Sequence, residues 1–301
     1  MPRSHTQQLT VLIQQLAELS CFAGIKSISL IEQGDSHPCF EVVDVNNRFF
    51  AKYFKDPNER QPYNKLYQLV ADEGLSPDLI YGDEFWQVSQ FVEGKSLNLC
   101  PLSVNEKIEQ AIKLMVRCHQ SIDVNKLTAI PILDMAKIIK PLTLTLSASQ
   151  KHMISKVCDM LSSRIVITPK VLCHGDINFS NIILANKPWL LDFDCARLAD
   201  REFDIAMMIA VNNLVSGSIS SVIDSCVEHY QVASNANIAI DKEKVTCYLY
   251  FSFIINGLWY LEQSRNNRDK SLQYQAFTQF TYFDECNFIT ENLMDDMASI
   301  V

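Results

Sequence analysis

The apolar positions near the start of the chain follow the period of a helix. Between residues 7 and 19, apolar side chains recur every three or four positions. They are Leu9, Leu12, Ile13, Leu16 and Leu19. This spacing places them on one face, so it predicts a short amphipathic helix. A second helix is expected over 59–73, with Pro62 in its first turn.

The segments on either side of that second helix have the residue composition of β-strands. Runs rich in aromatic and β-branched residues stand at 28–31, 39–43, 48–54 and 86–92. Turn residues separate the first three runs, and the Asn46-Asn47 pair favours a hairpin between the second and the third. The pattern therefore predicts a small antiparallel sheet in the first third of the chain.

Beyond residue 100 the helical period dominates. The expected helices span 104–121, 147–163, 202–214, 219–232, 242–264 and 270–293. A β-rich island at 171–195 interrupts them. This order predicts an α+β fold with a small β-rich lobe over 1–92 and a larger helical lobe over 93–301, joined by a hinge near 91–96.

Composition narrows the class of protein. The chain has 301 residues, of which 48% are hydrophobic, enough for a sizeable core in more than one domain. The formal net charge of −9 argues against nucleic acid or an anionic membrane as a partner. An acidic pocket would instead suit metal ions or a cationic substrate. Composition leaves the oligomeric state open.

The spacing of the cysteines and the hydropathy of the chain indicate the cellular compartment. None of the ten cysteines forms a CxxC pair, and several stand in apolar runs, which is typical of reduced, buried thiols. Residues 1–15 lack the apolar core of a signal peptide, and no run approaches the roughly 18 apolar residues of a membrane span. We therefore expect a soluble, cytoplasmic protein without a zinc site.

The β-rich island carries the most specific pattern in the chain. Apolar residues flank a polar loop that contains His174, Asp176 and Asn181. Asp192 stands eleven residues after Asn181, follows two leucines and begins the motif Asp192-Phe193-Asp194. The loop pattern by itself is weak, because Asp and Asn are also common turn and cap residues. Its combination with the second acidic motif favours a catalytic interpretation.

Phosphoryl transfer needs these residue types. A carboxylate must accept or orient the proton of the nucleophile, and Asp176 is the candidate. Oxygen ligands must hold Mg²⁺ against the triphosphate, and the Asn181 amide and the Asp192 carboxylate are the candidates. The sequence thus predicts an ATP- and Mg²⁺-dependent kinase.

These motifs resemble the aminoglycoside phosphotransferase and choline/thiamine kinase superfamily, whose fold is protein-kinase-like. The stretches 198–206 and 256–263 are similar to segments of its choline/thiamine kinase branch. Gly175 stands where protein kinases carry arginine, and a helix follows Asp192 too soon for an activation loop. The resemblance implies a small-molecule hydroxyl substrate rather than a protein substrate.

The resemblance also implies positions for the nucleotide. Lys52, with Lys55 as a competitor, would contact the ATP phosphates, and Glu59 would pair with that lysine. Ser36 and nearby backbone groups would line the phosphate loop, while the backbone near Gln90 and Val92 would bind the adenine edge. The phosphate loop contains a single glycine instead of GxGxxG, which leaves the choice between ATP and GTP open.

The remaining candidates concern support and substrate. His174 and Asp204 are expected to brace the catalytic loop. Asp194 could face a cationic substrate if the strand that carries Asp192 continues, and Trp259 could cover the cation. Most aromatics around Trp259 are equally expected in the core. Choline or thiamine is the favoured substrate. Aminoglycosides, or a catalytically weak nucleotide-binding pseudokinase, remain alternatives.

Overall fold

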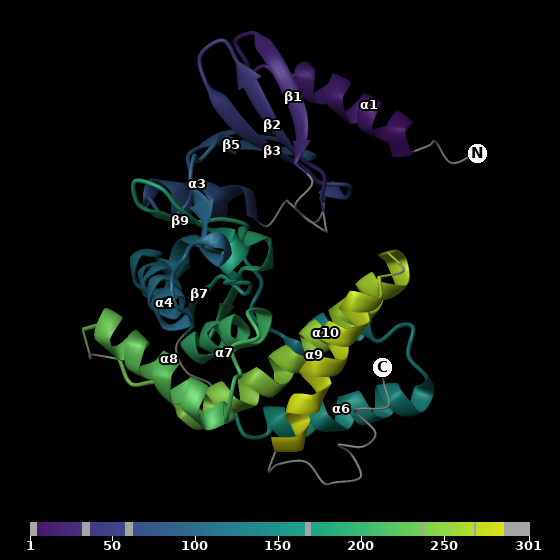
Figure 1. Ribbon diagram of the computed structural model, residues 1–301, viewed down its shortest axis with the longest axis vertical. Coiled ribbons are helices and arrows are strands. Elements are labelled where there is room, and N and C mark those ends of the chain that lie inside the picture. Colours follow the sequence, from purple (N-terminus) through teal and green to yellow (C-terminus); the bar gives the residue numbers. More distant parts are fainter. Residues whose placement is uncertain are drawn as a thin grey trace.

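A computed structural model shows two lobes, one built on a sheet and the other on helices (Figure 1). The structure describes residues 5–31, 37–57, 63–165, 170–235, 238–267 and 269–285. The sheet forms the upper part of the molecule in Figure 1, and most of the helices form the lower part. The predicted α+β architecture, with its β-rich N-terminal part and helical C-terminal part, is confirmed.

The upper lobe contains a five-stranded antiparallel sheet in the order β1-β2-β3-β5-β4. The strands are β1 (Ile25–Ile31), β2 (Cys39–Asp44), β3 (Arg48–Tyr53), β4 (Leu79–Gly82) and β5 (Trp86–Gln90). The predicted hairpin joins β2 to β3. Its turn is held by Asp44, whose Oδ1 accepts hydrogen bonds of 2.7 Å from the backbone N–H groups of Asn46 and Asn47.

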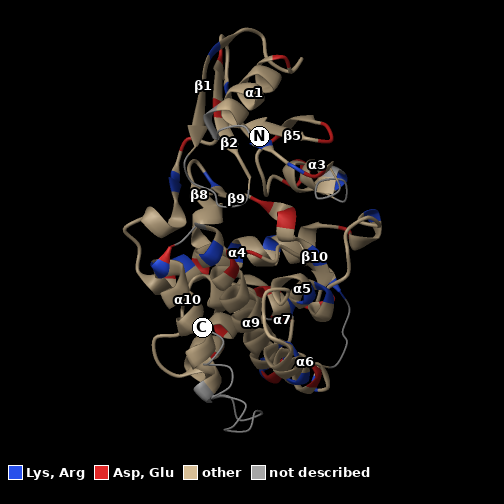
Figure 2. Ribbon diagram, turned by 90° about the vertical axis from the view of Figure 1, so that its right-hand side faces the viewer, with Lys and Arg blue, Asp and Glu red and all other residues tan. Residues whose placement is uncertain are grey.

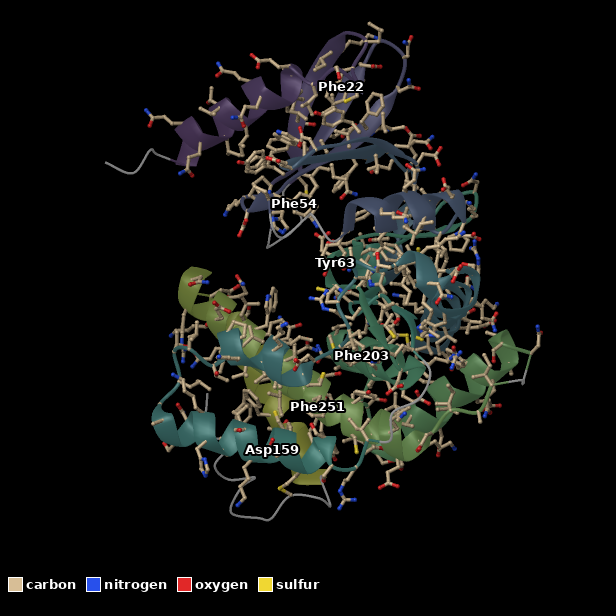
Figure 3. The ribbon with its side chains drawn as sticks, turned by 180° about the vertical axis from the view of Figure 1, so that it is seen from behind. Phe22, Phe54, Tyr63, Asp159, Phe203 and Phe251 are labelled. Atoms are coloured by element: carbon tan, nitrogen blue, oxygen red, sulfur yellow. The ribbon has the colours of Figure 1, made fainter. Side chains whose placement is uncertain are left out.

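Helix α1 (His5–Ala17) lies beside this sheet (Figure 1). Its Leu16 is buried in a compact cluster with side chains of β2, β3 and β5. Phe22, labelled in Figure 3, packs edge-on against Phe49 at 5.3 Å between ring centroids. The predicted amphipathic helix is therefore present, and it covers one face of the sheet.

Helix α3 (Asn64–Asp72) lies between β3 and β4 in sequence but packs with the helical lobe. Its buried residues, Leu66, Tyr67 and Val70 among them, belong to the larger core cluster. Past its end, the Leu190 N–H donates to the Leu75 carbonyl at 2.9 Å, and Lys187 Nζ donates to the Gly74 carbonyl at 3.0 Å. The helix is thus anchored to the lower lobe, and the division at residue 92 stays a prediction.

Seven helices of the lower lobe are described. They are α4 (Val104–Ser121), α5 (Met135–Leu142), α6 (Ala148–Ser162), α7 (Arg201–Val211), α8 (Ile219–Ala233), α9 (Lys242–Asn267) and α10 (Lys270–Thr281). Ser103 and Ser147 begin α4 and α6 with complete capping boxes, which explains the accuracy of those predictions. Helix α5 was not among the predicted helices, and its last turn contains Pro141, a residue that usually signals a break.

The predicted β-rich island forms short strands that frame the candidate site. They are β7 (Val171–Cys173), β8 (Ile182–Leu184), β9 (Pro188–Leu190) and β10 (Arg197–Ala199). β7 pairs with β10, while β8 lies between β9 and β6 (Lys95–Ser96). Short 3₁₀ turns complete the description: η2 (Leu97–Leu99), η3 (Val124–Lys126), η4 (Phe179–Asn181), η5 (Phe193–Cys195) and η6 (Tyr282–Glu285).

Charged residues of both signs are spread over both lobes (Figure 2). A search of the described helices found none with the length and apolar character of a membrane span. The nine described cysteines form no disulfide, and six of them are buried. This agrees with the expectation of reduced thiols.

Candidate active site

Asp176 and Asn181 are brought together by the loop between β7 and β8. The Asn181 Nδ2 group donates to Asp176 Oδ2 at 3.0 Å and to the Asp176 carbonyl at 3.1 Å. The turn η4 closes the loop, with the Asn181 N–H donating to the Asn178 carbonyl at 2.9 Å. The two side chains are therefore neighbours, and the Asn181 amide oxygen lies on the side away from the Asp176 carboxylate.

The loop is braced from below by Asp204, which is fully buried on α7. Asp204 accepts hydrogen bonds of 2.8 Å from the backbone N–H groups of both His174 and Gly175. His119 Nε2 lies 3.0 Å from Asp204, and its Nδ1 lies 2.9 Å from the Tyr230 hydroxyl. A carboxylate that satisfies two backbone donors of the loop fixes the loop's path.

His174 holds the loop against the segment that follows β9. Its Nδ1 accepts from the Asp176 N–H at 3.2 Å, so its Nε2 carries the proton and donates to the Leu191 carbonyl at 2.8 Å. The ring also packs at 4.6 Å from Phe193. The imidazole thus ties the residue before Asp192 to Asp176.

Gly175 has a steric reason to be glycine. Its φ is +78°, in the left-handed region, and an added Cβ would lie 2.4 Å from the Cys195 carbonyl oxygen. Side chains rarely adopt this conformation, and backbone atoms cannot yield that much space. The close approach brings the catalytic loop against the segment that carries the second acidic motif.

His119, Cys173 and Asp204 gather three potential metal ligands in the core, with ligand atoms within 4.8 Å of one another. Each of the three groups already has a protein partner. The Cys173 thiol donates to the Asp200 carbonyl at 3.2 Å, and Asp204 accepts from His119 as well as from the loop. This cluster fits a structural brace better than a metal site.

Asp192 stands two residues after the end of β9 and contacts Lys52 of the sheet lobe. The Leu191 N–H donates to the Asn181 carbonyl at 2.8 Å, which sets the register between the two acidic motifs. Asp192 itself adopts left-handed angles, φ 64° and ψ 66°, so the strand ends there. Burial raises the pKa of Asp176, and the negative charge of Asp192 adds to that rise, as expected of neighbouring carboxylates.

Lys52 joins the sheet lobe to the second acidic motif. Its Nζ lies 2.8 Å from Asp192 Oδ1 and 2.5 Å from Asp194 Oδ2. Burial by itself would lower the pKa of Lys52, but the two carboxylate charges outweigh burial and hold it above the ordinary value. Its side chain is 9% exposed, so it is not a solvated edge lysine, whereas Lys55 is exposed.

We expected Asp194 to face a cationic substrate. In the structure it contacts Lys52 and Tyr67. Its Oδ2 binds Lys52, and its Oδ1 accepts a hydrogen bond of 2.6 Å from the Tyr67 hydroxyl. The expectation assumed a continuous strand, but β9 ends at Leu190 and the chain turns through η5. Both acidic side chains of the motif therefore meet Lys52, and the substrate role of Asp194 stays a prediction.

The segment at the predicted hinge offers backbone groups, and Arg48 of β3 contacts it. The Gln90 N–H already donates to the Asp78 carbonyl at 3.0 Å, whereas the described residues provide no hydrogen-bond partner for the backbone of Val92. Arg48 stacks on Phe91 at 4.4 Å and binds the carboxylate of Glu93. Sequence reasoning missed Arg48, since a lysine or arginine at the start of a strand carries no specific signal.

Three further candidates stand apart from this cluster or outside the description. Ser36 and Glu59 lie outside the described residues. Trp259 is half-buried on α9 and packs against Tyr260 at 5.3 Å between ring centroids. Most other aromatics of that helix are buried in the core, as the alternative interpretation expected.

The site thus brings together oxygen ligands and one cation. The Asn181 amide oxygen and the Asp192 carboxylate are hard donors, of the kind that Mg²⁺ prefers, and Lys52 is placed to meet phosphate oxygens. Asp176 lies beside Asn181, where it could accept a proton. This donor set fits a magnesium–nucleotide complex.

Comparison with solved structures shows the same fold in small-molecule kinases. The choline kinase LicA from Streptococcus pneumoniae is 16% identical, with a TM-score of 0.70, over 97% of this chain and 99% of that one. The Plasmodium vivax ethanolamine kinase is 16% identical, with a TM-score of 0.66, over 89% and 84% of the two chains. A spectinomycin phosphotransferase in complex with ADP and spectinomycin is 16% identical, with a TM-score of 0.60, over 96% and 98%.

A search of curated proteins found no match. The protein-kinase-like fold expected from the sequence is confirmed by the structural likenesses. The sequence over residues 27–233, more than half of the chain, matches the model of the phosphotransferase enzyme family. That span contains the sheet, the catalytic loop and the second acidic motif. The chain therefore belongs to the phosphotransferase enzyme family.

Proposed function

We propose that this enzyme transfers the γ-phosphoryl group of ATP to a hydroxyl of a small, cationic molecule, with choline or thiamine favoured. The observation that carries the proposal is the convergence of Asp176, Asn181 and Asp192 opposite Lys52. These residues come from one loop, one strand end and the sheet of the other lobe. Phosphoryl transfer requires such a set, and it depends mostly on positioning and charge neutralisation.

Each residue has a distinct role in the proposed reaction. Asp176 orients the substrate hydroxyl and accepts its proton as the oxygen attacks the γ-phosphorus. Asn181 and Asp192 would hold Mg²⁺, which supplies positive charge to the phosphate oxygens. Lys52 binds the phosphates from above, and His174 and Asp204 keep the loop in place. The Val92 backbone, which lacks a partner in the described chain, is suited to the adenine edge.

Support for a cationic substrate comes from charge and from likeness. The net charge of −9 and the carboxylate of Asp176 favour a positively charged molecule near the site. Trp259 is half-buried, so part of its ring remains accessible for a cation–π contact. Two of the structural neighbours are a choline kinase and an ethanolamine kinase, which phosphorylate small amino alcohols.

An aminoglycoside is the second candidate substrate. The likeness to a spectinomycin phosphotransferase, over 96% of this chain, favours it. Both candidates are cationic and carry hydroxyl groups, so the described residues do not separate them. A purified enzyme screened for ADP release with choline, ethanolamine, thiamine and a panel of aminoglycosides would decide between them. ADP release with none of these compounds would contradict the substrate class.

The variant Asp176→Ala tests the catalytic role of Asp176. We expect kcat to fall by about 10²–10⁴-fold while binding of Mg·ATP is retained, because the proton acceptor is lost. Asp159→Ala, an exposed carboxylate on α6 far from the lobe junction (Figure 3), is the control. Turnover at the wild-type rate by Asp176→Ala would contradict the catalytic role of Asp176, whereas a wild type that binds Mg·ATP without any turnover would favour a nucleotide-binding role.

A further inference from the structure

Lys52 has two carboxylate partners, and only one of them is free to stay with it during the proposed reaction. Its Nζ contacts Asp192 at 2.8 Å and Asp194 at 2.5 Å. Asp192 is one of the two side chains that would hold Mg²⁺, so its charge has to be shared with the metal. Asp194 is the remaining acidic partner, and it makes the shorter contact.

Asp194 is held in place by a buried phenol. The Tyr67 hydroxyl donates to Asp194 Oδ1 at 2.6 Å, while Asp194 Oδ2 binds Lys52. Tyr67 is 4% exposed, and its ring packs edge-on to Phe193, the central residue of the motif, at 6.3 Å. Both oxygens of Asp194 are therefore held by hydrogen bonds, which fixes the orientation of the carboxylate.

The described part of α3 offers Lys52 no carboxylate of its own. The helix has no acidic residue in its first turn, and its single acid, Asp72, is bonded to Gln68 at the far end. Two buried tyrosines lie one turn apart, Tyr63 at the N-cap and Tyr67 in the helix. The Tyr63 hydroxyl accepts a hydrogen bond from Arg197, so both phenols reach the segment around the second acidic motif.

The end of α3 is also attached to the helical lobe. Arg117 Nη2 lies 3.3 Å from the Glu73 carbonyl, and Lys187 Nζ lies 3.0 Å from the Gly74 carbonyl. Cations at the C-terminal end of a helix stabilise it. Tyr67 therefore packs in the same core cluster as Phe193, next to Asp194, whereas Lys52 reaches this cluster from the sheet.

We propose that Asp194, oriented by Tyr67, is the residue that positions Lys52 against the nucleotide phosphates, the role that the family resemblance assigned to Glu59. This inference rests on the proposed function. It makes Asp194 and Tyr67 positioning residues, because both act through the amino group of Lys52. The second acid of the motif thus serves the nucleotide side of the site rather than the substrate side.

The test is a double-mutant cycle on binding and turnover. Asp194→Asn keeps the shape of the side chain and removes its charge. We expect it to weaken binding of a non-hydrolysable ATP analogue with Mg²⁺ by about 10-fold, and to lower kcat/KM for ATP by about 10–100-fold. In a Lys52→Ala background the same change is expected to have less than a twofold effect. A defect of general structure would instead persist in that background.

Tyr67→Phe sharpens the test because it removes only the hydroxyl. We expect a three- to tenfold loss in kcat/KM for ATP, about the net value of one ordinary hydrogen bond, with the melting temperature nearly unchanged. Asp72→Asn and Tyr274→Phe, at exposed positions, are the matched controls. Their kinetic constants should stay within twofold of the wild type.

Two outcomes would overturn the inference and separate it from the proposed function. If the wild type binds the analogue, and Asp194→Asn and Tyr67→Phe bind it as tightly or more tightly, Asp194 does not position Lys52. A Glu59→Gln variant with the full loss would then restore the assignment to Glu59. If the wild type binds no nucleotide, the proposed function fails as well.

Discussion

The catalytic loop and Lys52 are held in place in two different ways. The loop is fastened through its backbone: the N–H groups of His174 and Gly175 bind Asp204, which has no exposed surface. Lys52 is fastened through side chains alone, to Asp192 and Asp194, whose side chains are 41% and 21% exposed. One anchor is internal to a lobe, and the other crosses between the lobes.

The two kinds of anchor serve different purposes: the loop is preorganised, whereas Lys52 can exchange its partners. A loop whose backbone donors are satisfied by a buried carboxylate keeps its geometry before any substrate arrives, which favours electrostatic catalysis. A lysine paired with accessible carboxylates can share its charge with an incoming triphosphate. The structure therefore predicts that damage to the loop anchor affects folding and turnover together, whereas damage around Lys52 affects mostly nucleotide use.

The largest effect is expected from Asp204→Ala. The change leaves the N–H groups of His174 and Gly175, together with His119, without their buried acceptor. We expect the free energy of unfolding to fall by about 3–5 kcal/mol, measured by urea denaturation, with turnover lost in the fraction that still folds. Asp224→Ala, at an exposed ion pair on α8, is the control. A loss below 1 kcal/mol would contradict the proposed anchor.

Gly175→Ala probes the contact between the loop and the second acidic motif. The new Cβ would lie 2.4 Å from the Cys195 carbonyl oxygen, at a φ of +78°. We expect a destabilisation of about 1–3 kcal/mol and a lower kcat, because the loop has to shift away from Asp192. Gly217→Ala has open space around its Cβ and is the control, followed by thermal unfolding and steady-state kinetics. Equal stability of the two variants would show that the loop is not tightly seated.

The pH dependence of turnover tests the surroundings of Asp176 in the catalytic loop. Burial and the nearby charge of Asp192 raise the pKa of Asp176 above its ordinary value of 3.8. Only the ionised carboxylate can accept a proton, so kcat/KM should rise with pH through this raised pKa and level off above it. Lys52 stays protonated across that range, because its pKa is raised as well. An acidic limb centred at or below pH 3.8 would contradict the described surroundings of Asp176.

The smallest effect is expected from Arg48→Gln. Arg48 bonds Glu41 at 2.8 Å on the neighbouring strand and also binds Glu93 beside the hinge, but its side chain is 40% exposed. Exposed pairs contribute little, so we expect a stability change below about 1 kcal/mol that shrinks further in high salt. Urea denaturation at two salt concentrations measures it. A larger, salt-independent loss would show that the hinge link is as deeply anchored as the catalytic loop.

Local patterns were sufficient for much of the fold. Helices α4 and α6 begin where Ser103 and Ser147 form capping boxes, which depend on residues three positions apart. Helix α5 was not predicted, and it contains Pro141, a residue that is unusual inside a helix. Asp176, Asn181 and Asp192 could be selected because their spacing within a β-rich island is specific. Tyr67 could not, although its place one turn after Tyr63 on a buried helix face is a signal in hindsight.

The sequence by itself determined the α+β class and the two acidic motifs, since each depends on residue types and on spacing along the chain, whereas the choice of Lys52 over Lys55 came from the tertiary structure. The tertiary structure decided which side chains meet. Asp194 turned toward Lys52 because β9 ends at Leu190 and the chain enters a 3₁₀ turn. Helix α3 joined the lower lobe because its buried face packs there. Such contacts join residues more than 100 positions apart, such as Tyr67 and Asp194, and no local pattern encodes their distance.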